Sequence, residues 1–200
     1  MAGFLPAGTV ELNQQSRGLG GPARGQANTC QQVLGPSALI GYDVRMLARA
    51  PQQSELSLHQ LMMPEHANML GNVHGGAIMK MMDETGAICA MRHAGRVCVT
   101  LAVDSMKFHS PVHVGQLLCC RGRVTWVGNT SIEVEVHVNA EDAIHGNITH
   151  TNSGHFVYVA LDDEHRPVKV PALLLETEAD RMSYAAAQAR RDVRLKIMST

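Results

Sequence analysis

The chain has 200 residues, a formal net charge of -1 and 45% hydrophobic residues. This length suits one domain with a sizeable core and is hardly enough for two. The near-zero charge gives no bulk electrostatic reason for nucleic-acid binding or for attachment to an anionic membrane surface. No apolar run approaches the ~18 residues of a membrane span. We therefore expect neither a nucleic-acid partner nor a membrane-spanning segment.

The cysteines and histidines carry no pattern of a metal site. Five cysteines occur, an odd number. Four of them lie inside apolar runs without CxxC spacing, namely Cys89, Cys98, Cys119 and Cys120. Buried free thiols are the expected outcome and are typical of a reducing compartment. His109 and His113 are four residues apart, but Pro111 between them argues against a helix. With no HExxH or Cys/His ligand set, we expect no metal and no other cofactor.

The composition changes near residue 53. Residues 1–53 are rich in Gly, Gln, Ala and Pro, without sustained periodicity. They predict a mostly disordered extension, with one short ordered piece around ALIGYDVRMLARA, residues 38–50. Residues 54–200 are expected to form the single folded domain. The extension has more Arg than acid, so an organelle transit peptide is the alternative to a cytoplasmic location, although Ser is scarce.

The first readable elements after residue 53 are a strand and a long helix. ELSLHQLMM, residues 55–63, begins with an alternation of Leu and polar residues and reads as a strand that Pro64 ends. Residues 75–93 predict a helix whose apolar side chains spread over nearly the whole circumference. Such a helix is buried on most sides, so we expect a sheet to wrap around it.

Four further strands and a helix follow. The strand candidates are VCVTLAVDSMKFHS (97–110), LLCCRGRVTWVG (117–128), SIEVEVHVNA (131–140) and ITHTNSGHFVYVAL (148–161). In the first of these, every second residue from 97 to 103 is apolar and shares one face; in the third, residues 132, 134, 136 and 138 point inward and the intervening polar ones outward. Clean alternation predicts antiparallel strands with one buried face. Gly128-Asn129 predicts a hairpin turn between two strands, and residues 176–196 predict a charged terminal helix.

These elements predict an α+β architecture, with an antiparallel sheet wrapped around one long central helix and a helix at the carboxyl end.

The polar entrance of the central helix is the strongest candidate for a site. Helix amino termini present unpaired N–H groups and a partial positive charge. Gly75 and Gly76 lack a Cβ, so a ligand can approach the backbone closely there. The position suits an anion, or a carbonyl oxygen that becomes one; a simple tight turn is the alternative.

Asp83 lies about two turns further along the same helix. An ionised carboxylate in an apolar helix is costly unless it is paired or reaches water. Two interpretations stay open. In one, Asp83 sits at a subunit seam and bonds to backbone; in the other, it is a general base tuned by partial burial.

Three segments carry a resemblance to a known family. MMPEHANMLGNVHGGAIMKMMDETGA (62–87), VCVTLAVDSMKFHSPVHVGQ (97–116) and HTNS (150–153) resemble the hotdog-fold acyl-CoA thioesterases. The similarity is to the long-chain or brain-type acyl-CoA hydrolases in their single-hotdog, bacterial form, and it covers about residues 56–196. It implies a helix wrapped by an antiparallel sheet, and hydrolysis of the thioester bond of fatty acyl-CoA to free fatty acid and coenzyme A.

The resemblance also assigns roles to residues. The family's catalytic Asn falls on Asn68 and its catalytic acid on Asp83. Some relatives carry their acid at the position of Asn72, so this chain resembles the branch that depends on the helix Asp. The family forms dimers whose sites draw on two chains, usually assembled as trimers of dimers. Asn68 and Asp83 are therefore expected to come from different subunits of a homo-oligomer.

The mechanism that follows is hydrolysis without a Ser or Cys nucleophile. Backbone N–H groups near Gly75 and Gly76 stabilise the oxyanion, Asp83 accepts a proton from water, and Asn68 orients the water or the thioester. Asn72 and Thr100 are expected to position substrate. His74 either polarises the same carbonyl or, as we favour, is a structural hydrogen-bond partner. Candidate contacts to coenzyme A, for which a solvated helix face is the alternative in the case of the Arg residues, are His150, Thr151, Asn152, Arg190 and Arg191.

Two other functions compete with hydrolysis. A non-catalytic hotdog module would bind acyl-CoA as a sensor, but residues 1–53 show no helix-turn-helix pattern of the kind such regulators carry. A hotdog hydratase or dehydratase would pair an Asp with a His in a different motif. The sequence gives neither the preferred acyl-chain length nor any regulation by nucleotide.

Overall fold

The computed structural model describes residues 46–198, which belong to one compact unit of the chain. The elements in chain order are α1 (Pro51–Ser54), β1 (Leu56–Leu61), the short 3₁₀ helix η3 (Pro64–His66), α2 (Gly75–Ala94), β2 (Val97–Phe108), β3 (Leu117–Val127), β4 (Ser131–Asp142), β5 (Asn147–Leu161) and α3 (Glu178–Met198). Every strand and both long helices expected from the sequence are present. No helix among the described residues is long and apolar enough to cross a membrane.

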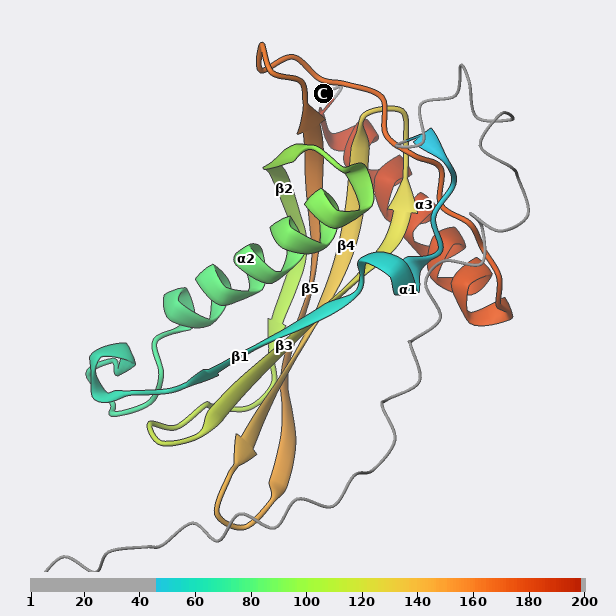
Figure 1. The fold of residues 1–200 in the computed structure, drawn as a ribbon. Helices are drawn as coiled ribbons and strands as arrows, with labels where there is room; N and C mark the ends of the chain where they lie inside the picture. Colours follow the sequence, from blue (N-terminus) through green and yellow to red (C-terminus); the bar gives the residue numbers. More distant parts are fainter. Residues whose placement is uncertain (1–45, 199–200) are drawn as a thin grey trace, which may run out of the picture. The chain divides into compact units, whose positions relative to one another are not determined.

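The five strands form one antiparallel sheet in the order β1-β3-β4-β5-β2 (Figure 1). The turn between β3 and β4 is closed by a hydrogen bond from Gly128 N to Ser131 O at 2.8 Å, which confirms the hairpin predicted at Gly128-Asn129. On β4, the inward residues Ile132, Val134, Val136 and Val138 are fully buried. The predicted α+β class, with a long helix against an antiparallel sheet, is confirmed.

The helix α2 begins and ends where its sequence provides caps. His74 is its N-cap, and its side chain accepts a hydrogen bond from Gly76 N. At the other end Gly95 adopts φ 65°, a left-handed conformation that glycine tolerates without a Cβ penalty, and its N–H donates to Met91 O. These caps define the two ends of α2.

Within one chain, α2 buries a single stripe and not its whole circumference. The buried positions recur every three or four residues, at Ile78, Met81, Met82, Thr85, Gly86, Cys89, Ala90, His93 and Ala94. Of the remaining apolar residues, Met79 is exposed, whereas Ala87 and Met91 are half-buried at the margin of the core. The wide apolar surface read from the sequence therefore consists of one buried stripe and a second stripe, through residues 79, 87 and 91, that the chain's own sheet covers only in part.

The helix α3 covers the opposite face of the sheet (Figure 1). Glu133 is fully buried and bonds to Arg190 of α3, while its neighbours Ile132 and Val134 lie in the core against α2. Because successive side chains of a strand point to opposite faces, the two helices lie on different sides. Glu133 points outward as predicted, but the surface there is covered by α3.

The edge strand β2 departs from simple alternation. Two irregularities, between Thr100 and Ala102 and between Val103 and Ser105, shift its register against β5. Val97, Val99, Leu101 and Val103 therefore do not share one buried face as the sequence predicted, and each is 45–64% exposed. β2 thus presents an apolar edge with which no other strand of residues 46–198 pairs.

Part of the segment predicted as an extension packs on the folded unit. The guanidinium of Arg49 donates to the carbonyl oxygens of Arg92 and His93 at the end of α2, at 2.5 and 2.8 Å. The backbone of Arg49 also forms an isolated parallel β-bridge with Leu173, and Ala50 is buried. Residues 1–45 lie outside the described residues, so the domain boundary near residue 53 stays a prediction.

His93 makes the stability of this unit depend on pH. It is fully buried, donates from Nε2 to Pro171 O at 3.1 Å, and has no partner for Nδ1. Burial lowers the pKa of His93. In the unfolded chain this imidazole binds a proton at its ordinary pKa of ~6.5, whereas in the folded chain it stays neutral to lower pH. We expect the free energy of unfolding to fall below that pH, by at most ~1.4 kcal/mol per pH unit.

The measurement is urea unfolding at several pH values for the wild type and His93→Gln. The difference between the two curves isolates this residue, and it should grow as the pH drops below that of the unfolded imidazole. His113→Gln, which replaces an exposed imidazole, is the control and should keep the wild-type pH dependence. Equal pH dependence in wild type and His93→Gln would contradict the assignment.

Candidate functional site

Asp83 is held by two hydroxyl groups from the sheet. Thr100 on β2 donates to Asp83 Oδ1 at 2.7 Å. Tyr158 on β5 donates to the same Oδ1 at 3.2 Å and to the backbone carbonyl of Asp83 at 3.0 Å. Among the described residues, Oδ2 has no hydrogen-bond partner. Asp83 is half-buried on the open side of α2, so its free oxygen can meet a ligand or water.

Gly86 provides the space in which the Tyr158 hydroxyl lies. A Cβ on Gly86 would stand 2.3 Å from that oxygen. Glycine inside a helix costs roughly 0.5–1 kcal/mol relative to alanine, and here the cost is offset by the hydroxyl packed against the helix. Tyr158 is itself fully buried. Nothing in the sequence singled this residue out, beyond the rule that a buried tyrosine hydroxyl needs a partner.

The start of α2 offers one backbone donor, not two. The N–H of Gly76 donates to His74 Nδ1 at 2.9 Å, so it is occupied by the cap. The N–H of Gly75 has no partner among the described residues. The structural interpretation of His74 agrees with this geometry, and the prediction that both glycines present free donors does not.

Asn68 organises the turn that leads into α2. Its Oδ1 accepts hydrogen bonds from Leu70 N at 2.8 Å and Asn72 N at 3.3 Å. Its backbone N–H donates to Asn72 O at 2.7 Å. The side-chain oxygen thus serves the local turn, a role typical of Asn, and the side-chain amide NH2 group is left to face a ligand.

Asn68, Asn72 and Gly75 line one hollow of about 350 Å³. Its other walls come from Ile78 on α2 and from Phe108 and the segment that follows β2. A Cβ on Gly75 would stand 3.5 Å from the Phe108 ring, an ordinary contact distance. The hollow therefore combines one free N–H donor, two amides and an apolar wall.

The predicted site residues consequently fall into two patches of one chain. Gly75 and Asn68 belong to the hollow at the helix start, whereas Asp83, Thr100 and Tyr158 meet two turns later. Eight residues separate Gly75 from Asp83, which is ~12 Å along a helix axis. A single thioester carbonyl cannot touch both patches of the same chain.

The HTNS segment contributes less surface than predicted. Thr151 and Asn152 are fully buried; Thr151 Oγ1 donates to Val138 O, and Asn152 Nδ2 donates to Lys107 O. Their side chains hold neighbouring strands together and do not reach a ligand in this chain. His150 is exposed and pairs with Asn139 and Ser153.

Arg190 and Arg191 are engaged within the chain. Arg190 holds the buried Glu133 at 2.7 Å. The guanidinium of Arg191 lies 5.1 Å from the centre of the Trp126 ring. Both belong to α3, on the face of the sheet opposite to Asp83. The geometry does not bring them to the predicted site of the same chain.

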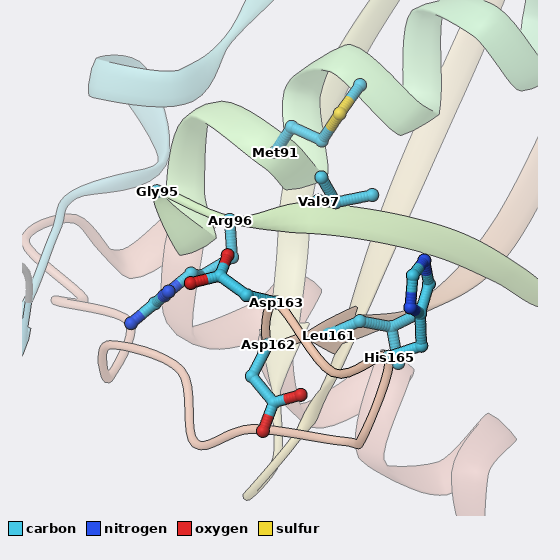
Figure 2. A pocket seen from close by; sticks show the side chains of 8 residues that line it. All are labelled: Met91, Gly95, Arg96, Val97, Leu161, Asp162, Asp163 and His165. Atoms are coloured by element: carbon cyan, nitrogen blue, oxygen red, sulfur yellow. The ribbon is translucent and has the colours of Figure 1, made fainter.

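A larger hollow, of about 610 Å³, lies at the carboxyl end of α2 (Figure 2). Met91 and Val97 form part of its wall, and Asp162 and His165 come from the turn after β5. Asp162 Oδ1 is already used by two backbone N–H groups of that turn. No residue predicted for the site lines this hollow.

The described cysteines are not activated nucleophiles. Burial raises the pKa of Cys89, Cys98 and Cys120 to about 12, so these thiols stay protonated near neutral pH. Among residues 46–198 no group of three His, Cys, Asp or Glu side chains is arranged to hold a metal ion. The carboxylate of Asp83, with one oxygen held by two hydroxyls, is therefore the candidate general base.

Comparison with known proteins adds to this geometry. A family model described as the thioesterase superfamily matches residues 70–146. Protein VdlD of Helicobacter pylori is 34% identical over 144 residues, which cover 72% of this chain and 82% of that protein. The cytosolic acyl coenzyme A thioester hydrolase of Rattus norvegicus is 36% identical over 139 residues, covering 68% of this chain and 36% of that protein.

Solved structures share the fold. A hexameric acyl-CoA thioesterase superposes with a TM-score of 0.73 at 34% identity, covering 76% of this chain and 97% of that one. An acyl-CoA hydrolase of Staphylococcus aureus, solved with butyryl coenzyme A and coenzyme A, gives 0.70 at 30% identity, covering 76% and 94%. Its solved variants replace one Asn, one Asp and one Thr by alanine. Those positions are fifteen and then seventeen residues apart, as are Asn68, Asp83 and Thr100.

Proposed function

The chain belongs to the thioesterase superfamily, and we propose that it hydrolyses the thioester bond of fatty acyl-CoA, with Asp83 as the general base. The observation that carries the proposal is the Asp83 carboxylate, fixed through one oxygen and open at the other. The shared spacing of Asn68, Asp83 and Thr100 with the three substituted positions of the Staphylococcus aureus hydrolase supports the same residues.

The reaction needs one water molecule and no acyl-enzyme intermediate. Asp83 Oδ2 accepts a proton from water as the oxygen of that water attacks the thioester carbonyl carbon. The Gly75 N–H, at the positive end of α2, stabilises the oxyanion that forms. The C–S bond then breaks, and the sulfur of coenzyme A leaves with the proton that Asp83 had taken. The NH2 group of Asn68 positions the thioester or the water.

We place the two halves of each site on different copies of the chain. Because Gly75 and Asp83 lie ~12 Å apart in one chain, a single thioester carbonyl of the substrate cannot contact both residues of the same chain. If two copies of α2 pack side by side in opposite directions, Asp83 of one copy lies near the helix start of the other. The partly covered stripe of α2, with Met79 next to Asp83, supplies an apolar surface for that packing.

The edge strand β2 favours the same assembly. It exposes a row of valine and leucine side chains, and an unpaired apolar edge is a template for pairing with another chain. A homodimer formed through β2 and α2 buries this row. The hexameric relative supports the association of such dimers into a larger oligomer.

A charge on the β2 edge should break the assembly. We expect Val99→Asp to shift the protein to monomers and to lower kcat by at least about 100-fold, because each site then lacks half of its groups. Sedimentation velocity measures the mass, and thiol release measures the activity. Met182→Glu, which places a charge on the exposed surface of α3, should keep both. An active monomer of Val99→Asp would contradict the shared site.

The function itself is tested by release of free thiol from acyl-CoA substrates. A thiol-reactive dye follows turnover from acetyl-CoA to palmitoyl-CoA, and the profile of kcat/KM names the preferred chain length. The alternative is a non-catalytic acyl-CoA-binding module. That protein would bind acyl-CoA in a direct titration without releasing thiol, and this result would remove the enzyme proposal.

We also propose a cytoplasmic location. The support is the cytosolic relative of Rattus norvegicus and the four unpaired cysteines of the described residues, which suit a reducing compartment. Fractionation of cells that express the full chain with a carboxyl-terminal tag distinguishes the cytoplasm from an organelle.

A further inference from the structure

The hydroxyl of Tyr158 lies against α2, in the space left by the missing Cβ of Gly86. It lies within hydrogen-bond distance of two acceptors of one residue, the carbonyl oxygen and Oδ1 of Asp83, at 3.0 and 3.2 Å. The missing Cβ of Gly86 leaves the room, since that atom would stand 2.3 Å from the hydroxyl oxygen. Two elements distant in sequence, α2 and β5, are thus shaped around this one group.

Thr100 and Tyr158 approach the carboxylate at the same oxygen. Thr100 Oγ1 lies 2.7 Å from Oδ1 of Asp83, and the Tyr158 hydroxyl 3.2 Å from it. Two donors from different strands fix both the position and the rotation of the carboxylate plane. Oδ2 is left without a partner among the described residues, and Asp83 is only half-buried, so this oxygen is accessible to water.

We propose that Tyr158 is a positioning residue for hydrolysis, which with Thr100 clamps Oδ1 of Asp83 and assigns Oδ2 as the oxygen that takes the proton from water. This inference rests on the proposed function and names the atom that performs it. Tyr158 is fully buried in the chain, so it acts through Asp83 and does not touch the substrate.

The hydroxyl is suited to the role of a fixed donor. Burial and then the neighbouring carboxylate of Asp83 raise the pKa of Tyr158 above its ordinary value. The hydroxyl therefore keeps its proton across the neutral and mildly alkaline range. It does not exchange protons during turnover, and its contribution is geometric.

The decisive experiment is Tyr158→Phe, measured by thiol release with the oligomer intact. The ring stays in the core and only the hydroxyl is lost. We expect kcat to fall about 10-fold or more, because the carboxylate loses one of two orienting bonds. We expect KM to stay within about twofold, because the ring is shielded from the substrate. Tyr184→Phe, a tyrosine on α3 against Trp126, is the matched control and should keep kcat.

Two further variants separate positioning from a general loss of structure. In an Asp83→Asn background, Tyr158→Phe should cause no further loss of the residual rate, because its effect passes through the carboxylate. Gly86→Ala pushes the hydroxyl off Asp83 while keeping the tyrosine. It should lower kcat as Tyr158→Phe does, and in the Asp83→Asn background it should likewise cause no further loss of the residual rate.

Failure of the positioning role of Tyr158 and failure of the proposed hydrolase function give different results. Absence of thiol release in the wild type refutes the proposed function. Full kcat in folded Tyr158→Phe, with an active wild type, refutes the positioning role. Should Tyr158→Phe fail to fold, Gly86→Ala decides the question: unchanged kcat in that variant overturns the proposal. A further drop in the Asp83→Asn background also overturns it, because Tyr158 would then act by another route.

Discussion

Replacing Asp83 with Asn is expected to lower kcat for acyl-CoA hydrolysis by about 10²–10⁴-fold, the range of a lost general base. Asn keeps an oxygen that accepts the bonds from Thr100 and Tyr158, so the fold and the packing at the site should remain. What is lost is the oxygen that takes the proton from water. KM should change little, because the substrate still meets the same apolar and amide groups. Steady-state thiol release, with the oligomer checked by sedimentation, gives both constants.

The neighbouring Glu84 is the control for this prediction. It is the next residue on α2, is about half exposed, and pairs with Lys80 at 3.3 Å. Glu84→Gln removes one negative charge within one residue of Asp83 but touches no hydroxyl of the sheet. Its kcat should stay within about twofold of the wild type. Equal losses in the two variants would show that charge on this part of α2, and not the base, controls the rate.

Replacing Arg190 with Ala is expected to destabilise the protein by ~3 kcal/mol, the cost of leaving a buried charge without its partner. Glu133 is 0% exposed, and its Oε1 takes hydrogen bonds from Arg190 and from Thr125 Oγ1, while Oε2 has no partner. Without the guanidinium, this carboxylate must be desolvated unpaired or must bind a proton. Urea unfolding at a fixed protein concentration measures the loss.

The same variant tests the sequence-based assignment of Arg190 to coenzyme A binding. A structural role lowers the free energy of unfolding and leaves KM unchanged in the folded protein. A coenzyme A contact raises KM and leaves stability unchanged. Arg191→Ala is the matched control on α3. It removes a cation–π contact with Trp126 of ~0.5–1 kcal/mol, so its effect on stability should be several times smaller.

The sequence was sufficient for the fold because each element carries its own periodic signal. The alternation along Ile132 to Val138 gives a strand with one buried side, and the glycine after His93 and Ala94 marks the end of α2. These signals are local, so one sequence is enough to read them. Neither the strand order nor the crossing of α3 over the far face has such a local signal.

The arrangement of the site was predictable only in part. Asp83 stood out as a carboxylate in an apolar helix, its catalytic role and that of Asn68 followed from a resemblance, and the helix start followed from the chemistry of its N–H groups. The capture of the Gly76 N–H by His74 is local, but it depends on one side-chain rotation that the sequence does not specify. The contact of Tyr158 with Asp83 depends on the register of β5, and the burial of Thr151 and Asn152 depends on the pairing of β5 with its neighbours. These last two are tertiary properties that no window of sequence contains.

The shared space of Gly86 and Tyr158 restricts the order in which the two residues can arise. A chain with a Cβ at position 86 has no room for the hydroxyl, since the two atoms would lie 2.3 Å apart. A chain with glycine at 86 and phenylalanine at 158 bears only the modest helix cost of the glycine. The mutational path that stays folded therefore loses the side chain at 86 first and gains the hydroxyl at 158 second. Glycine at position 86 is therefore the substitution that must come first for tyrosine to be tolerated at position 158.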